Sequence, residues 1–170
     1  MFDKIKILIM DVDGTLTDGK IYIGENGEIM KAFNVKDGIA IINLIKNNII
    51  PVFLTARQSK IVEYRAKELG VTEVFQGISD KTKILNDLCE KYGITYENIA
   101  YIGDDVQDLS AIELVGFSFA PNDASEIIRQ KVDVVLNKKC GEGALREAVE
   151  YIFYYAKISD GHVVNASLHK

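Results

Sequence analysis

The apolar run IKILIM at residues 5–10 passes directly into DVDGT at residues 11–15. A short apolar run of this kind is typical of a buried strand, and two carboxylates follow where the strand is expected to end. Outward from this point, short apolar runs alternate with segments of helical periodicity, which predicts an α/β fold with a parallel sheet and crossover helices. The predicted strands are 5–10, 50–54, 73–75, 99–102, 117–120 and 132–136, and the predicted helices are 38–47, 59–69, 81–92, 109–115, 124–130 and 143–156.

Composition limits the class of protein. The 170 residues are 48% apolar and 26% charged, which suits one globular domain over 1–170. The apolar runs are too short to cross a membrane, and the first residues lack a small-residue cleavage pattern, so we expect a cytoplasmic protein. A net charge of -5 argues against nucleic-acid binding. Cys89 and Cys140 lie far apart with no adjacent histidine, which predicts neither a disulfide nor a zinc site.

One segment, 20–31, interrupts the alternation. Two strand-like arms flank Gly24–Gly27, and Asn26-Gly27 tolerates the positive φ of a tight turn, so the segment predicts a β-hairpin. A surface hairpin is one interpretation. The other is a flap over a ligand, because the hairpin follows the first strand and ligands of open parallel sheets bind beyond the carboxyl ends of the strands.

A second acidic cluster, GDDVQD at 103–108, follows the predicted strand 99–102. Each cluster taken alone could be an Asp-rich turn. In a parallel sheet, however, both lie at the same edge, where five carboxylates repel one another unless cations compensate them. The pattern therefore favours Mg²⁺, which prefers hard oxygen ligands.

Cationic and hydroxyl side chains are predicted at the same edge. Lys81 begins a predicted helix, where it opposes the helix dipole unless Asp80 caps that end. Thr55 and Arg57 end a predicted strand, and Arg65 falls inside the apolar arc of a helix, where it needs an anionic partner or must snorkel to solvent. Each has a simple structural interpretation, and a bound phosphate would account for all of them together.

Four signatures in sequence order, DxDGT at 11–15, Thr55, Lys81 and GDDxxD at 103–108, resemble the haloacid dehalogenase superfamily of phosphatases. The resemblance implies a Rossmann-like parallel sheet flanked by helices and hydrolysis of a phosphate monoester through an aspartyl-phosphate. The gaps between the motifs are too short for a full cap domain, so we expect a capless member with the hairpin as a flap. An open site of this kind also predicts a homo-oligomer.

The resemblance also implies roles for individual residues. Asp11 would attack phosphorus, and Asp13 would protonate the departing oxygen and then activate water. Mg²⁺ would let the anionic nucleophile and phosphate approach. Its ligands would be Asp11, the backbone carbonyl of Asp13 and Asp104, with Thr55 and Lys81 on phosphoryl oxygens and Asp105 and Asp108 orienting Lys81 or metal-bound water.

More local features resemble one branch, the 3-deoxy-D-manno-octulosonate 8-phosphate phosphatases of lipopolysaccharide biosynthesis. They are DVDGTLTDG at 11–19, the hairpin, FNVKDG at 33–38, FQG at 75–77 and GEGALRE at 141–147. The branch implies a small phosphorylated sugar-acid substrate and a tetramer whose hairpins pack together. The substrate-binding residues that it implies are Asn34, Val35, Lys36, Asp37, Gly38, Ala56, Arg57, Arg65 and Lys81. Ala56 and Cys140 stand where the branch has glycine.

Three alternatives stay open. A related nine-carbon sugar-acid 9-phosphate phosphatase would favour glutamate at the Arg57 position. A phosphoacceptor receiver domain also gathers acids and a lysine at a sheet edge, but the second aspartate of DxDGT disfavours it. A silent oligomerisation module is disfavoured by the intact acids. The polar tail, 158–170, predicts disorder, whereas the resemblance implies that it closes over a neighbouring active site.

Overall fold

The computed structural model describes residues 4–159 and contains a six-stranded, wholly parallel sheet with the order β5-β4-β1-β6-β7-β8. The chain runs from β1 outward to β4 and β5, then returns to the other side of β1 as β6, so the strand order reverses between β1 and β6. The predicted α/β class is confirmed. The strands are β1 Ile7–Met10, β4 Ile50–Leu54, β5 Glu73–Phe75, β6 Ile99–Ile102, β7 Phe117–Ala120 and β8 Val134–Val135.

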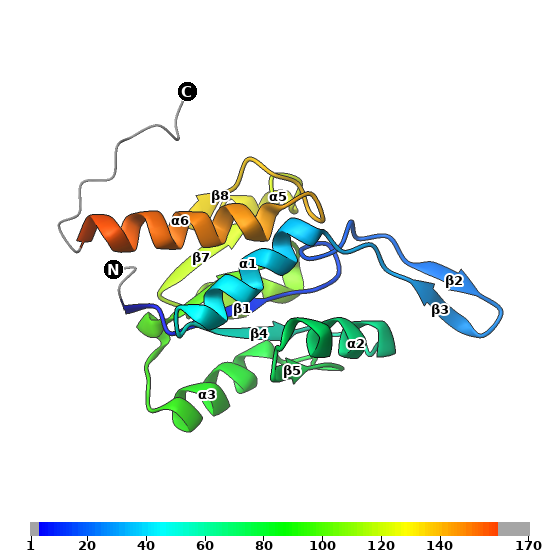
Figure 1. The fold of residues 1–170 in the computed structure, drawn as a ribbon, viewed down its shortest axis with the longest axis horizontal. Coiled ribbons are helices and arrows are strands. Elements are labelled where there is room, and N and C mark those ends of the chain that lie inside the picture. Colours follow the sequence, from blue (N-terminus) through cyan, green and yellow to red (C-terminus); the bar gives the residue numbers. More distant parts are fainter. Residues whose placement is uncertain (1–3, 160–170) are drawn as a thin grey trace.

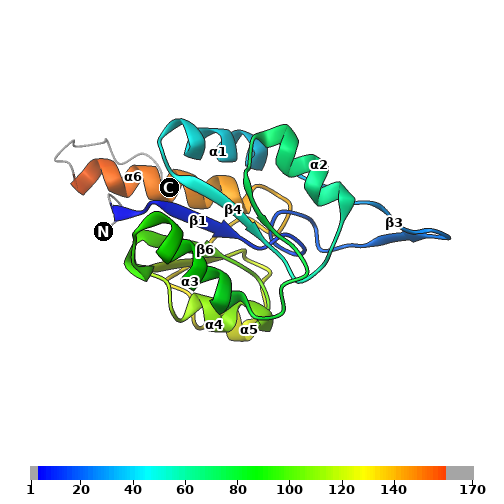
Figure 2. The ribbon, with the colours of Figure 1, turned by 90° about the horizontal axis from the view of Figure 1, so that it is seen from below.

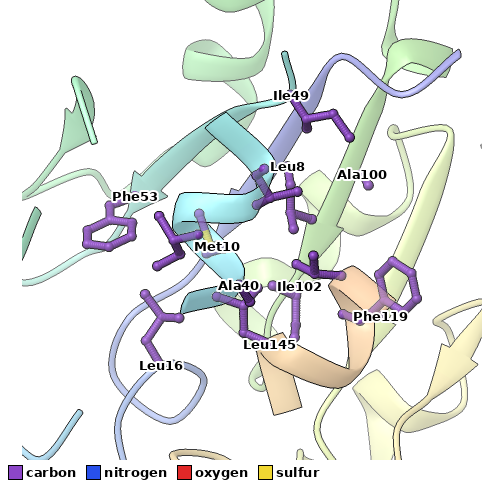
Figure 3. Packing of buried hydrophobic residues seen from close by; sticks show 14 of the residues in the cluster. Leu8, Met10, Leu16, Ala40, Ile49, Phe53, Ala100, Ile102, Phe119 and Leu145 are labelled. Atoms are coloured by element: carbon purple, nitrogen blue, oxygen red, sulfur yellow. The ribbon is translucent and has the colours of Figure 1, made fainter. Parts of the chain in front are cut away.

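Helices cover both faces of the sheet (Figure 2), because strand side chains alternate between the two faces. In β1, Leu8 and Met10 join one buried cluster, whereas Ile7 and Ile9 join the other. Figure 3 shows the first cluster, where Ala40 and Leu145 of the covering helices meet the sheet. That face carries α1 Val35–Lys46, α2 Lys60–Leu69 and α6 Ala144–Ser159; the other carries α3 Lys81–Tyr92, α4 Leu109–Ile112 and α5 Glu126–Arg129, with 3₁₀ turns η2 Tyr96–Asn98 and η3 Val106–Asp108.

Capping residues set the helix ends. Gly70 and Gly93 end α2 and α3 in the left-handed conformation, as predicted. The helix predicted at 38–47 begins three residues earlier, because Asn34 Oδ1 accepts a hydrogen bond from the N–H of Lys36 and caps it. The last helix continues to Ser159, two residues into the predicted tail, since the sequence has no glycine or proline between Ala144 and Gly161. The rest of that tail lies outside the described residues.

The predicted hairpin is present as β2 Tyr22–Gly24 and β3 Gly27–Met30, and it extends well beyond the sheet (Figure 1). The predicted turn was one residue out of place: Gly24 pairs with Gly27, so Glu25 and Asn26 form the turn, and of Asn26 and Gly27 only Gly27 has positive φ. A bridge between Thr17 and Phe33 closes the base of the hairpin and returns the second arm to the sheet edge.

Two further expectations concern membranes and thiols. Within residues 4–159, no helix combines the length and the apolar character needed to cross a bilayer. Both cysteines are free thiols, as predicted. Cys140 Sγ lies 3.3 Å from Asp123 Oδ2. Burial of the thiol is the main cause that raises its pKa to about 12, and the hydrogen bond to the Asp123 carboxylate is the second cause. A reactive thiolate is therefore disfavoured at this position.

Candidate active site

Three carboxylates meet beyond the carboxyl ends of β1 and β6, the adjacent strands between which the strand order reverses. Ligand oxygens of Asp11, Asp104 and Asp108 lie within 4.8 Å of one another. Asp11 and Asp108 are buried, and Asp104 is partly exposed. The prediction that the two acidic segments share one edge is confirmed, and the site lies where open α/β sheets bind their ligands.

Glycine makes this close approach possible. Gly14 has φ +91°, and a Cβ there would lie 2.2 Å from Asp104 Oδ2. A Cβ on Gly103 would lie 2.5 Å from Asp108 Oδ2. Because neither position carries a side chain, each carboxylate can lie against the backbone of the adjoining loop. Thr15 then donates a hydrogen bond of 2.9 Å to Asp104 Oδ1, which fixes the direction of that side chain.

Lys81 is buried at the first position of α3, whose N-cap is Asp80, as the sequence indicated. Its Nζ lies 2.6 Å from Asp11 Oδ1 and 2.5 Å from Asp108 Oδ1. It is therefore an interior cation between two carboxylates rather than a solvated helix-end lysine. This placement agrees with the predicted proximity of Lys81 to a phosphate site at the edge.

Asp108 is held on all sides. Tyr101 donates a hydrogen bond of 2.7 Å to its Oδ1, and the N–H groups of Asp104 and Asp105 donate to its Oδ2. The contacts to Lys81 and Tyr101 fix Asp108 as the support of the lysine. Asp105, by contrast, is exposed, and its side chain accepts from the N–H of Val106 at the start of η3. Its predicted role in orienting Lys81 stays a prediction.

Burial controls the charge of this cluster. It raises the pKa of Asp11 to about 8, although Lys81 acts in the opposite direction, and it raises the pKa of Asp104 to about 7 against the hydrogen bond from Thr15. Burial alone would lower the pKa of Lys81, but Asp11 and Asp108 outweigh it and raise that pKa. One lysine therefore does not balance the charge of three carboxylates. Without a further cation, these acids tend to stay protonated, and binding such a cation would stabilise their ionised forms.

Asp13 belongs to a second network. Lys31, at the end of the hairpin, donates a hydrogen bond to Asp13 Oδ1, and its Nζ lies 2.8 Å from Glu28 Oε1. Arg57 Nε lies 3.7 Å from Asp13 Oδ2, and Ser59 donates a hydrogen bond from its hydroxyl to Glu28. The predicted acid/base residue is thus surrounded by charged groups from the hairpin and from the loop after β4.

Residues 55–57 bring the end of β4 to the same edge. Thr55 is buried, and its hydroxyl accepts a hydrogen bond of 3.3 Å from the N–H of Arg57. Ala56 and the Arg57 side chain are exposed, so the guanidinium can reach a ligand beyond the edge.

The predicted substrate segment 34–38 forms the first turn of α1. Asn34 donates a hydrogen bond of 3.0 Å to the carbonyl of Gly141, which joins this turn to the loop before α6. Asp37 is only 3% exposed, and its Oδ1 accepts from the N–H of Arg146, so it caps α6 from the neighbouring helix. Val35 and Lys36 are exposed. The predicted substrate roles stay predictions, and the structure adds a structural role for Asp37.

Arg65 lies beside the same turn. A pocket is lined by Phe33, Asn34, Asp37, Gly38 and Arg65, among others. The guanidinium lies 5.7 Å from the Phe33 ring centre and pairs with Glu68 Oε2 at 2.7 Å, which supplies the anionic partner that its apolar position required. Arg57 and Arg65 therefore occupy two separate places: one is beside Asp13, and the other is beside the start of α1.

Sequence reasoning did not single out Thr15, Glu28, Lys31 or Tyr101. Thr15 was visible as part of DxDGT, and Tyr101 as a polar ring in an apolar strand. For Glu28 and Lys31 the available signal was a pair of opposite charges in the arm that returns from the hairpin to the sheet. Nothing local indicates that this pair meets Asp13.

Comparison with known proteins agrees with this geometry. Residues 69–147 match the model of a family described as haloacid dehalogenase-like hydrolase. Over 150 residues, 88% of this chain and 80% of the relative, the chain is 43% identical to the 3-deoxy-D-manno-octulosonate 8-phosphate phosphatase KdsC of Escherichia coli K12. The chain belongs to the haloacid dehalogenase-like hydrolases. Like its relatives in that family, it is a phosphoric monoester hydrolase of the 3-deoxy-D-manno-octulosonate-8-phosphatase type.

Solved structures of these hydrolases share the fold. The 3-deoxy-D-manno-octulosonate 8-phosphate phosphatase of Yersinia pestis is 40% identical with a TM-score of 0.89, over 94% of this chain and 86% of that one. The enzyme of Moraxella catarrhalis, in complex with magnesium ion, phosphate ion and a KDO molecule, is 38% identical with a TM-score of 0.86, over 95% of each chain. The cobalt-bound phosphatase of Haemophilus influenzae is 39% identical, with a TM-score of 0.89 over 96% of this chain and 95% of that one.

Proposed function

We propose that this hydrolase is Mg²⁺-dependent and converts 3-deoxy-D-manno-octulosonate 8-phosphate to the free sugar acid and phosphate. The observation that carries the proposal is the cluster of Asp11, Lys81 and Asp108, which are buried, with the partly exposed Asp104 at the switch point of the sheet. It occurs in a chain 43% identical to phosphatases named for that substrate. A nucleophile, a cation for the phosphoryl group and metal-binding oxygens lie together there.

Asp11 and Asp13 divide the chemistry. Asp11 attacks phosphorus in line, and the phosphorus–oxygen bond to the sugar breaks as the new bond forms. Asp13 gives its proton to the departing sugar oxygen. It then takes a proton from the water that hydrolyses the aspartyl-phosphate, so both residues return to their starting state. The two residues follow the same strand and face different networks, which lets one be a nucleophile while the other exchanges protons.

The acidic cluster fits a divalent cation. Asp11 Oδ2 is buried, and within residues 4–159 it has no hydrogen-bond partner. The raised pKa values of Asp11 and Asp104 indicate carboxyl groups short of positive charge. Asp11, Asp104 and the backbone carbonyl of Asp13 would hold Mg²⁺ through hard oxygens. The ion would supply charge neutralisation between the nucleophile and the phosphate.

Other side chains bind the phosphoryl group. The ammonium group of Lys81 contacts Asp11 and would also bind the oxygens of the substrate's phosphoryl group, while Asp108 holds this ammonium group in place. Thr55 adds a hydroxyl from the end of β4. Asp105 orients water at the rim. Charge that shifts onto the phosphoryl oxygens in the transition state is stabilised by groups that are already ordered.

The sugar acid needs further cations, because it carries a carboxylate besides the phosphate. Arg57 is beside Asp13 and exposed to solvent, so it can bind a carboxylate through two parallel hydrogen bonds. Arg65 acts at the other place, beside the first turn of α1. The remaining substrate contacts come from Asn34, Val35, Lys36, Asp37, Gly38 and Ala56.

Phosphate release from 3-deoxy-D-manno-octulosonate 8-phosphate tests the proposal. We expect Mg²⁺-dependent turnover, its abolition in Asp11→Asn, and full activity in Asp87→Asn, a control at an exposed carboxylate of α3. A panel with the nine-carbon 9-phosphate and simpler sugar phosphates ranks kcat/KM. A higher kcat/KM for the nine-carbon ester would make that ester the assigned substrate. Retained activity in Asp11→Asn would overturn the mechanism.

We also propose that the protein works in the cytoplasm as a homotetramer packed through its hairpins. Ile23 and Ile29 of the hairpin are 73% and 65% exposed, which is unusual for large apolar side chains on a projecting arm. Light scattering should give a tetramer for the wild type and smaller species for Ile23→Glu. Tyr64→Glu, which is 72% exposed on α2, is the matched control and should stay tetrameric.

A further inference from the structure

Lys31 is a buried cation outside the βα framework. Its side chain is 0% exposed, although it is the first residue after β3 of the projecting hairpin. Its ammonium group contacts Asp13 on one side and Glu28 on the other. A lysine buried to this extent needs anionic partners, so the contact with Asp13 is part of what makes this position tolerable.

Glu28 fixes the lysine from a second direction. It accepts a hydrogen bond from the hydroxyl of Ser59, which is itself the N-cap of α2. Arg57 Nη2 lies 3.9 Å from Glu28 Oε1 and Arg57 Nε lies 3.7 Å from Asp13 Oδ2. Lys31 and Arg57 therefore each lie beside both Asp13 and Glu28, so the two positive charges balance the two negative ones.

The two oxygens of Asp13 differ as a result. Oδ1 accepts the hydrogen bond from Lys31. Oδ2 is buried and, among the residues that the structure describes, accepts no hydrogen bond. A carboxyl group that donates a proton to a substrate oxygen works best when one of its oxygens is fixed by a hydrogen bond. The other oxygen then carries the proton and points toward the substrate.

We propose that Lys31 and Glu28 are positioning residues for this reaction: they hold Asp13 by Oδ1 so that Oδ2 delivers the proton to the departing oxygen. The proposal rests on the proposed function, in which Asp13 is the general acid. When the phosphorus–oxygen bond breaks, its electron pair stays on the substrate oxygen, which takes the proton from Asp13. Lys31 and Glu28 exchange no proton with the substrate.

The leaving group distinguishes positioning from general structural support. The alkoxide of a sugar is a poor leaving group and depends on protonation, whereas p-nitrophenolate leaves without it. A misplaced Asp13 should therefore slow departure of the sugar much more than departure of p-nitrophenolate, whereas it slows the later hydrolysis of the shared aspartyl-phosphate equally for both substrates. A disturbed fold or a damaged phosphate site would slow both to the same extent.

The test measures kcat and KM for both substrates in the wild type, Lys31→Met, Lys31→Arg and Glu28→Gln. In Lys31→Met, we expect the loss of kcat/KM on the sugar phosphate to exceed the loss on p-nitrophenyl phosphate at least about tenfold, because kcat/KM reports the steps up to departure of the leaving group and not the later hydrolysis of the shared aspartyl-phosphate. Lys31→Arg should recover part of the loss. Lys20→Met, at an exposed lysine before the hairpin, is the matched control and should match the wild type.

Equal losses of kcat/KM on the two substrates, or none, would overturn the proposal. If the wild type hydrolyses neither ester, the proposed function fails, and crystal structures of the wild type and Lys31→Met then decide the positioning claim separately. An Asp13 carboxylate that turns or becomes disordered in Lys31→Met supports the claim. A carboxylate in the same orientation in both structures overturns it.

Discussion

Lys31 and Lys81 each lie between two carboxylates, but they come from different parts of the fold. Lys81 begins α3, and its partners Asp11 and Asp108 are 1% and 0% exposed. Lys31 follows the hairpin, and its partners Asp13 and Glu28 are each 15% exposed. The same arrangement of charges is thus built once into the interior and once at a partly hydrated rim. The difference indicates that Lys81 contributes more to the stability of the fold, whereas Lys31 contributes more to the orientation of Asp13.

Removing Lys81 should have the largest effect. In Lys81→Met, Asp11 and Asp108 face each other in the interior without a cation, so we expect a loss of about 3–5 kcal/mol in the free energy of unfolding and about 10²- to 10³-fold in kcat. Urea unfolding and phosphate release measure the two losses. The control, Lys131→Met, breaks an exposed 3.1 Å pair with Glu113 and should cost less than about 1 kcal/mol. Similar losses in both variants would contradict the comparison.

Asp37 shows what a buried carboxylate does when no lysine holds it. Burial raises its pKa from 3.8 to about 6, although the N–H of Arg146 donates to it. Between these values the folded protein binds more protons than the unfolded chain, so this group lowers stability as pH rises, by up to about 3 kcal/mol. Asp37→Asn keeps the acceptor and should gain stability over the wild type from pH 4 to pH 7 in urea unfolding. The opposite trend would refute the assignment.

Lys31→Met should cost less stability than Lys81→Met, about 2 kcal/mol, because water can partly solvate Asp13 and Glu28 when the lysine is gone. Urea unfolding under one set of conditions for both variants gives the ranking. Lys20→Met serves again as the exposed control. A larger loss in Lys31→Met than in Lys81→Met would reverse the distinction between the two lysines.

Magnesium should distinguish the two networks as well. Asp11 and Asp104 have pKa values raised by burial to about 8 and about 7, so protons compete with the metal below those values. Mg²⁺ affinity should therefore rise with pH, by about a hundredfold per unit at pH 6, where both carboxyls lose a proton on binding, and by about tenfold per unit between pH 7 and 8. Calorimetry in two buffers of different ionisation enthalpy measures both quantities. Glu28→Gln should leave the affinity unchanged, and a flat pH profile in the wild type would argue against metal binding by these acids.

The sequence predicted the interior of the fold better than its edges. The bounds of β4, β5, β6, β7 and α3 match the prediction, because each apolar run or helical segment ends at a clear turn or cap. β1 is shorter than its apolar run, since its pairing with β4 and β6 begins only at Ile7. β8 is reduced to the two residues that pair with β7. Strand ends depend on the neighbouring strand, which a local pattern does not contain.

The same distinction applies to the site. Asp11, Asp104 and Lys81 could be placed from the sequence because each lies within two residues of the end of a strand or begins a helix of the sheet framework. The partners of Asp13 could not. They depend on a hairpin whose base is closed by the pairing of Thr17 with Phe33, a contact between residues sixteen positions apart that has no local sequence signature.

Gly14 and Gly103 limit how this protein can change over generations. Any side chain at either position meets a carboxylate oxygen within 2.2 Å or 2.5 Å, so even alanine displaces Asp104 or Asp108. Every amino acid reached from a glycine codon by one base change is larger. A duplicated gene released from selection would therefore lose its chemistry through single substitutions at the Gly14 codon, because Asp104 lies outside the pairs that Lys81 makes and the two apolar layers of the sheet still support folding. Such descendants would be intact, inactive proteins.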